Sequence, residues 1–118
     1  MEQRPSVLIV VDSDPHVSAR PAEAARIALG VAAWKQADVS LCLSGPAAAA
    51  LTEWPEDLVE GESFQHHLAS FVEAGGRVFT HKPSSDPAVP KGPEVPREQI
   101  DVNGLADLSR TASQLLRF

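Results

Sequence analysis

The sequence predicts an α/β fold: an open, mostly parallel sheet with helices on both faces. Residues 7–11 read VLIVV, an unbroken aliphatic run that is typical of a strand covered on both sides. Further apolar runs alternate along the chain with segments that have helical spacing. Such alternation requires crossover connections, which favour parallel strands and a three-layer arrangement.

The composition indicates one globular domain spanning residues 1–118. The chain is 43% hydrophobic and 22% charged, and its length allows a substantial core. The formal net charge is −6, and the basic residues are scattered along the sequence. Nucleic acids and anionic membranes both require clustered Lys and Arg, so we expect neither as a partner.

Cysteine usage and hydropathy set the expected location. Cys42 is the sole cysteine, which excludes an intrachain disulfide and a four-cysteine zinc site. The apolar run 7–11 is too short for a signal peptide, and no stretch approaches the ~20 apolar residues of a membrane helix. We therefore expect a soluble, cytoplasmic protein.

The first half of the chain contains two strands and two helices. The strand 7–11 ends in Asp12-Ser13-Asp14-Pro15, which is turn chemistry. Pro21 suits the first turn of a helix over residues 21–36. The second strand, 39–43, is followed by the breaker Ser44-Gly45-Pro46 and a short helix over 47–53. The apolar face of the first helix is expected to contain Ala24, Ala28, Val31 and Ala32, widened by Ile27 and Trp34.

The second half begins with a clearly amphipathic helix. Its apolar residues recur at i, i+4, i+7 and i+8, Ser63 is its expected N-cap, and Gly75-Gly76 end it. A third strand follows at 77–80, a short fourth at 100–102, and an edge strand at 114–118. Asn103 is the expected cap of a final helix. The apolar stripe of the amphipathic helix is Phe64, Leu68, Phe71 and Val72. The apolar stripe of the final helix is Leu105, Leu108 and Ala112.

A proline-rich loop is expected at residues 82–97. Five of the ten prolines lie there, and the last four recur at every third residue. This spacing favours local polyproline II geometry in an exposed loop. The alternative is a ligand for a proline-binding module.

The fold class also predicts where a site would lie. In open α/β sheets, ligands bind beyond the carboxyl ends of the strands, at the point where the strand order reverses. If the first strand is central, the loops 12–16 and 80–83 flank that point. They offer a ligand-binding set of Asp12, Asp14, His16, His81 and Lys82. An Asp/His cluster can bind a metal or act as base and orienter, whereas the plainer interpretation is turn and surface residues.

Other reactive residue types have plainer interpretations. His66 and His67 are adjacent on a helix and cannot chelate one metal from one face, so we expect solvated or interface residues. Cys42 lies in an apolar strand and is expected to be a buried hydrophobe. The sequence has no GxGxxG, GxxxxGK[ST] or GxSxG motif. No cofactor and no bound metal are therefore predicted.

Several segments together resemble the DsrE/DsrF-like family. They are VLIVV at 7–11, SDP at 13–15, RPAEAARIAL at 20–29, ADVSLCL at 37–43, GGRVF at 75–79, NGLADL at 103–108 and LLRF at 115–118. The resemblance covers most of the chain outside the proline-rich loop. It implies a three-layer α/β fold with a five-stranded, largely parallel sheet, homo-oligomers (dimers, trimers or hexamers) and a role in sulfur relay.

The chain departs from that family at one position. Active members have a persulfide-bearing cysteine just after the third strand, where this chain has His81. The leading hypothesis is therefore a non-catalytic DsrE-like domain that binds a small ligand or a protein partner in a sulfur-related context. The alternatives are an enzyme with an Asp/His metal or acid-base site, and an oligomeric scaffold.

Overall fold

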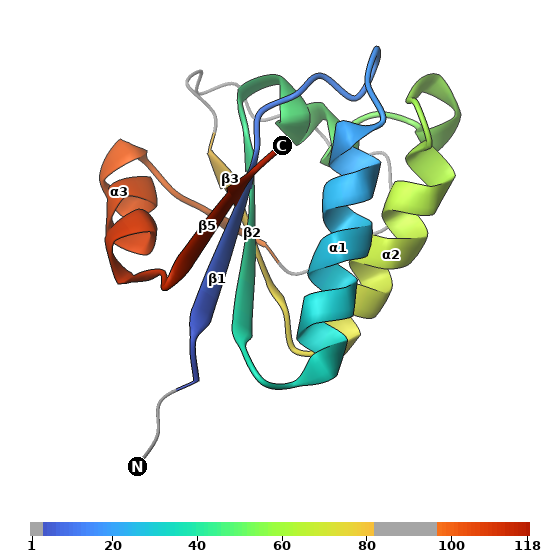
Figure 1. Ribbon diagram of the computed structural model, residues 1–118. Coiled ribbons are helices and arrows are strands. Elements are labelled where there is room, and N and C mark those ends of the chain that lie inside the picture. Colours follow the sequence, from blue (N-terminus) through green and yellow to red (C-terminus); the bar gives the residue numbers. More distant parts are fainter. Residues whose placement is uncertain (1–3, 82–96) are drawn as a thin grey trace.

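The computed structural model describes residues 4–81 and 97–118, which form one sheet with helices on both sides (Figure 1). All four strand pairings are parallel, and the strand order is β4-β3-β2-β1-β5. The predicted three-layer α/β architecture with a five-stranded sheet is confirmed. The strands are β1 (Ser6–Val11), β2 (Asp38–Ser44), β3 (Arg77–His81), β4 (Glu98–Gln99) and β5 (Gln114–Arg117).

The helices divide unequally between the two faces of the sheet. Helices α1 (Arg20–Trp34) and α2 (Gly61–Glu73) lie side by side on one face, and α3 (Val102–Thr111) is the one helix of the described residues on the other (Figure 1). Two 3₁₀ helices, η1 (Gly45–Leu51) and η2 (Pro55–Asp57), connect β2 to α2. The predicted short helix after β2 is thus present with 3₁₀ geometry and begins two residues earlier.

The larger core fills the space between the sheet and the α1/α2 layer. Small alanines on α1 allow close approach to the sheet, while Phe64, Leu68 and Phe71 of α2 are almost fully buried. The predicted apolar stripe of α2 is therefore confirmed as core. Truncating a buried phenylalanine typically costs about 3–5 kcal/mol, so this stripe is a major source of stability.

The second core is much smaller and lies beneath α3. Leu8, Cys42 and Phe79 are its buried members, and they come from β1, β2 and β3. Leu105, Leu108 and Ala112 of α3 pack against them, as the sequence predicted. Because Ile9 and Val11 belong to the larger core, β1 is covered on both faces.

Two predicted helix starts are wrong. Helix α2 begins at Gly61, so Ser63 lies inside it, and Glu60 occupies the cap position with a φ of 55°. A Cβ on Gly61 would lie 2.1 Å from the Pro55 carbonyl oxygen. The contact with Pro55 therefore requires glycine at this position, and tertiary packing rather than a side-chain cap determines the start of α2.

The start of α3 also differs from the one predicted from the sequence. Asp101, not Asn103, is its cap: the Asp101 Oδ1 accepts a hydrogen bond from the Gly104 N–H at 2.8 Å. The fourth strand is β4 at Glu98–Gln99, so the predicted strand at 100–102 is also wrong. Ile100 instead packs against the small core, and its N–H donates to the Thr80 carbonyl.

Trp34 does not widen the buried face of α1, because it is 66% exposed at the helix end. The next residue, Lys35, adopts a left-handed conformation that ends the helix. Most of the predicted loop 82–97 lies outside the described residues, so its structure stays a prediction.

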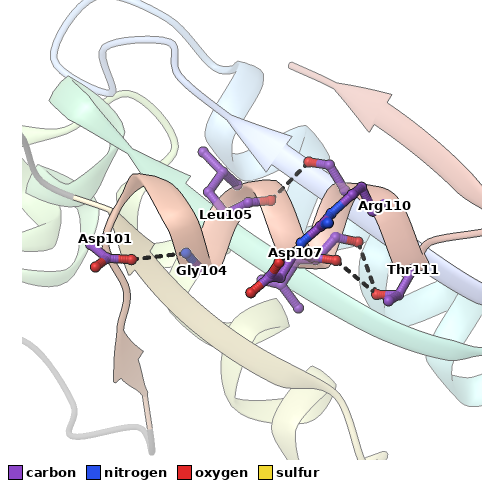
Figure 2. A network of polar contacts seen from close by, with 8 residues as sticks. Asp101, Gly104, Leu105, Asp107, Arg110 and Thr111 are labelled. Atoms are coloured by element: carbon purple, nitrogen blue, oxygen red, sulfur yellow. Dashed lines mark hydrogen bonds and ion pairs between the residues drawn. The ribbon is translucent and has the colours of Figure 1, made fainter.

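None of the residues of α3 is fully buried, and local polar contacts add to the packing of Leu105 and Leu108 on the small core. Figure 2 shows the Asp101–Gly104 cap at one end and the Thr111 hydroxyl donating to the Asp107 and Leu108 carbonyls at the other. An ion pair between Asp107 and Arg110 joins successive turns. These contacts stabilise the helix that covers the small core.

Replacing the α3 cap tests this assignment. Asp101→Ala is expected to lower the free energy of unfolding by about 1 kcal/mol, because the Gly104 N–H loses its acceptor. Asn103→Ala, the matched control, is expected to leave stability unchanged or slightly raise it. Urea unfolding of both variants measures the difference. A larger loss for Asn103→Ala would contradict the assignment.

Candidate functional site

The carboxyl edge of the sheet contains most of the site residues that the sequence predicted. Asp12 follows β1 and forms an ion pair with Arg117 at the end of β5. The Arg117 Nη2 and Nε atoms lie 2.8 and 3.1 Å from the same Asp12 oxygen. The pairing of Val10 with Arg117 in the β1–β5 register brings these side chains together. Asp12 is thus paired with Arg117, which is not among the site residues predicted from the sequence.

Asp14 and His16 form a second, separate pair in the β1–α1 loop. The Asp14 Oδ1 accepts from the His16 backbone N–H at 2.9 Å and contacts the His16 Nδ1 at 2.8 Å. The backbone hydrogen bond, and then the side-chain contact, hold the pKa of Asp14 below its ordinary value. This is the arrangement of an Asx turn, in which the carboxylate orders its own loop.

His81 lies at the end of β3 and contacts Ser44 at the end of β2. The Ser44 Oγ and the His81 Nδ1 are 3.1 Å apart, and both residues are half-buried. The two residues are direct partners in the β2–β3 register. Gly45, with a φ of 57°, turns the chain into η1 immediately after Ser44.

Sequence reasoning missed Ser44 because Ser44-Gly45-Pro46 was treated only as a strand breaker. A signal was available: if two neighbouring strands end together in a parallel sheet, the residues at their carboxyl ends become neighbours. The register between β2 and β3 could not be derived from periodicity, since β3 is short and has only two apolar residues, Val78 and Phe79.

The predicted residues therefore share one edge without forming one cluster. Asp12 follows β1 and His81 ends β3, with β2 between these two strands, so the strands are separated by about 10 Å. Lys82 lies outside the described residues. Within residues 4–81 and 97–118, no three His, Cys, Asp or Glu side chains come together as a metal site would require.

Ser13 adds an unusual feature to this edge. Its Oγ is buried and has no hydrogen-bond partner among the described residues. Because Val11 pairs with Leu43, Ser13 and Ser44 follow the ends of neighbouring strands. A buried hydroxyl without a partner costs about 1–3 kcal/mol.

Cys42 lies two residues before Ser44, inside the small core. Its side chain is fully buried, as predicted, and pairs in register with Phe79. Burial in this apolar environment raises the pKa of the Cys42 thiol to about 11. The thiol is therefore protonated at neutral pH and is a poor nucleophile.

The histidine pair on α2 lies apart from this edge. His66 is exposed, and the His67 Nδ1 lies 3.4 Å from the Ser63 Oγ one turn earlier. None of the helices in residues 4–81 and 97–118 has the length and apolar character needed to cross a membrane.

Comparison with solved structures identifies the fold. The crystal structure of the ychN protein from E. coli superposes with a TM-score of 0.73, covering 97% of this chain and 99% of that chain. The fold is that of YchN. This agrees with the DsrE-like architecture expected from the sequence. Sequence identity to YchN is 21%, so the likeness concerns the fold alone. Neither a scan against protein-family models nor a search of curated proteins finds a significant match.

The environment of Cys42 predicts slow chemistry at its sulfur. Alkylation by iodoacetamide at neutral pH is expected to be slow in the native protein and rapid in urea, because burial both shields and protonates the thiol. The chain has a single cysteine, so mass spectrometry gives an unambiguous readout. Rapid native labelling, or recovery of a persulfide on Cys42, would contradict this view.

Proposed function

We propose that this chain is a non-catalytic DsrE-like protein that binds a small sulfur oxyanion at the carboxyl edge of its sheet. The observation that supports this most directly is the Ser44–His81 pair, 3.1 Å apart and half-buried. The proposed site comprises this pair together with Ser13, the Asp12–Arg117 ion pair and the Asp14–His16 loop. Lys82, which follows His81 in the sequence, is included as part of the proposal.

The geometry of the pair favours a ligand that accepts hydrogen bonds. When the Ser44 hydroxyl donates to the His81 Nδ1, the imidazole proton lies on Nε2, which then offers an N–H donor. The Ser13 hydroxyl, buried and without a hydrogen-bond partner among the described residues, is included in the proposal as a second donor. An oxyanion such as thiosulfate has acceptor oxygens that fit these donors.

The same contacts favour binding over catalysis. A histidine base in hydrolytic enzymes is usually oriented by a third group, commonly a carboxylate. Among the described residues, His81 has the Ser44 hydroxyl as its polar contact, whereas the carboxylates of Asp12 and Asp14 bind Arg117 and His16. The neutral, buried Cys42 provides no nucleophile at this edge.

Ligand-induced stabilisation tests the proposal. Thiosulfate is expected to raise the melting temperature of the wild-type chain with increasing concentration, by a free energy that reaches about 2.7 kcal/mol at one hundred times Kd. His81→Ala and Ser44→Ala are expected to lose most of this rise. His66→Ala, an exposed histidine on α2, is the matched control and is expected to keep it.

The control separates specific binding from a general salt effect. Sodium chloride at equal ionic strength measures the nonspecific contribution. An equal rise in wild type and His81→Ala would refute the site, and no rise in wild type beyond sodium chloride would refute the sulfur-oxyanion ligand.

We also propose that the chain assembles into homo-oligomers through β5. Phe64, Leu68 and Phe71 of α2 are buried in the core, so they do not form an interface. Instead, all four residues of β5 are exposed, with Leu115 at 55% and Leu116 at 37%. Leu115 pairs with Leu8 and Leu116 with Ile9, so the two leucines point to opposite faces of the sheet.

An apolar edge strand favours pairing with another strand, and natural proteins usually protect such edges with charge. The opposite edge strand, β4, follows that rule with Glu98 and Gln99. Antiparallel pairing of two β5 strands about a two-fold axis would extend the sheet across both copies and cover both leucines.

A charge at this edge is expected to disrupt the assembly. Leu115→Glu should shift the mass in solution from an oligomer toward the single chain, as measured by light scattering after size exclusion. Val102→Glu, which replaces an equally exposed apolar residue on α3, should leave the mass unchanged. A wild-type chain that stays monomeric at high concentration would contradict the proposal.

A further inference from the structure

A cavity of about 310 Å³ lies between the C-terminal end of α3 and the amino-terminal ends of β1 and β2. This volume is at the lower end of the range for small-molecule sites. Helix α3 reaches this end of the sheet, where the Ser6 hydroxyl at the start of β1 donates to the Thr111 carbonyl at 2.9 Å.

The strand registers place chemically different groups around this cavity. Leu8 pairs with Ser40, and Ser40 pairs with Arg77, so these three residues form a row across β1, β2 and β3. Leu108 and Ala112 of α3 add apolar surface beside Leu8. The cavity thus has an apolar end near α3 and a cationic end near β3.

Arg77 is oriented before any ligand arrives. Its guanidinium lies over the Phe79 ring, 5.0 Å from the ring centroid, and its Nη2 atom is 3.6 Å from a Glu98 oxygen. Both Arg77 and Glu98 are largely exposed, so this ion pair contributes little. A guanidinium has five N–H donors in a planar fork, and within the described residues the ion pair uses Nη2 alone. A carboxylate matches the remaining donors with bidentate geometry.

Asp38 limits the charge of the ligand. Asp38 lines the cavity two residues before Ser40, and its exposed carboxylate forms an ion pair with Arg4 at 3.7 Å. A second negative group on a ligand in this cavity would be repelled by the Asp38 carboxylate. The cavity is therefore suited to one carboxylate attached to a short apolar body.

We propose that this cavity binds a short aliphatic monocarboxylate, with the carboxylate on Arg77 and the hydrocarbon against Leu8, Leu108 and Ala112. The Ser40 hydroxyl, half-buried on the floor between these two ends, hydrogen-bonds the carboxylate from below. The site is independent of the Ser44–His81 edge, because the two lie at opposite ends of the same strands.

The test is a titration of the labelled protein with 3-methylbutanoate, followed by two-dimensional amide NMR. Shifts are expected at residues of β1, β2, β3 and the C-terminal turn of α3. Arg77→Gln should weaken binding about tenfold or more, the loss typical of removing a charged hydrogen-bond partner. Arg26→Gln, which removes an exposed arginine on α1, is the matched control and should bind like wild type.

Three further measurements make the result decisive. Succinate at the same concentration should bind more weakly than 3-methylbutanoate, because Asp38 opposes its second carboxylate. Ser40→Leu, which fills the cavity but keeps Arg77, should also abolish the shifts, and the spectrum of each variant reports whether it folds. Ala112→Leu provides a second filling variant if Ser40→Leu does not fold.

Absence of shifts at these residues in the wild-type chain would overturn the proposal. So would unchanged affinity in Arg77→Gln, or equal binding of succinate. Loss of binding in Ser44→Ala would place the ligand at the opposite edge and would also overturn it.

Discussion

Strand β1 is hydrogen-bonded along both edges, to β2 on one side and to β5 on the other, and the arrangement of polar groups depends on these two registers. The β5 register places Arg117 beside Asp12. The β2 register, continued through β3, places Ser44 beside His81. A shift of one residue in either pairing would move each partner to the opposite face of the sheet and separate both pairs. The same registers align Leu8, Ser40 and Arg77 at the other end of the strands.

The two faces of the sheet differ in how completely they are covered, and this difference shapes the functional surfaces. Helices α1 and α2 bury the larger core, with Phe71 and Leu41 fully enclosed. In the part of the chain that the structure describes, α3 is the one helix on the opposite face, where the core has three buried residues. The stable layer holds the sheet in place, while the sparsely covered face retains polar strand residues that can meet a ligand. Both candidate binding regions include side chains from this second face.

The sequence predicted the layers of the fold better than its local boundaries. The run at residues 7–11 and the spacing of Phe64, Leu68 and Phe71 are long, strong patterns, and the structure confirms both. The starts of α2 and α3 were wrong because the contact of Gly61 with Pro55 and the Asp101 cap depend on neighbouring segments. Asp12, Asp14, His16 and His81 lie at the carboxyl edge of the sheet, but the partners of Asp12 and His81 were not predicted. Asp12 and Arg117 are far apart in the chain, and only the position of β5 in the sheet brings them together.

The isolation of Cys42 has a practical consequence for studying this protein. Because the native thiol is enclosed by Leu8, Phe79 and α3, the surface of the described chain presents no sulfhydryl group. A cysteine introduced at an exposed site, such as Gln114 on β5, would be the only thiol open to a spin label or a fluorophore. Distances between labelled copies could then be measured in solution without altering the interior. Because Cys42 does not react, it need not be replaced before such labelling.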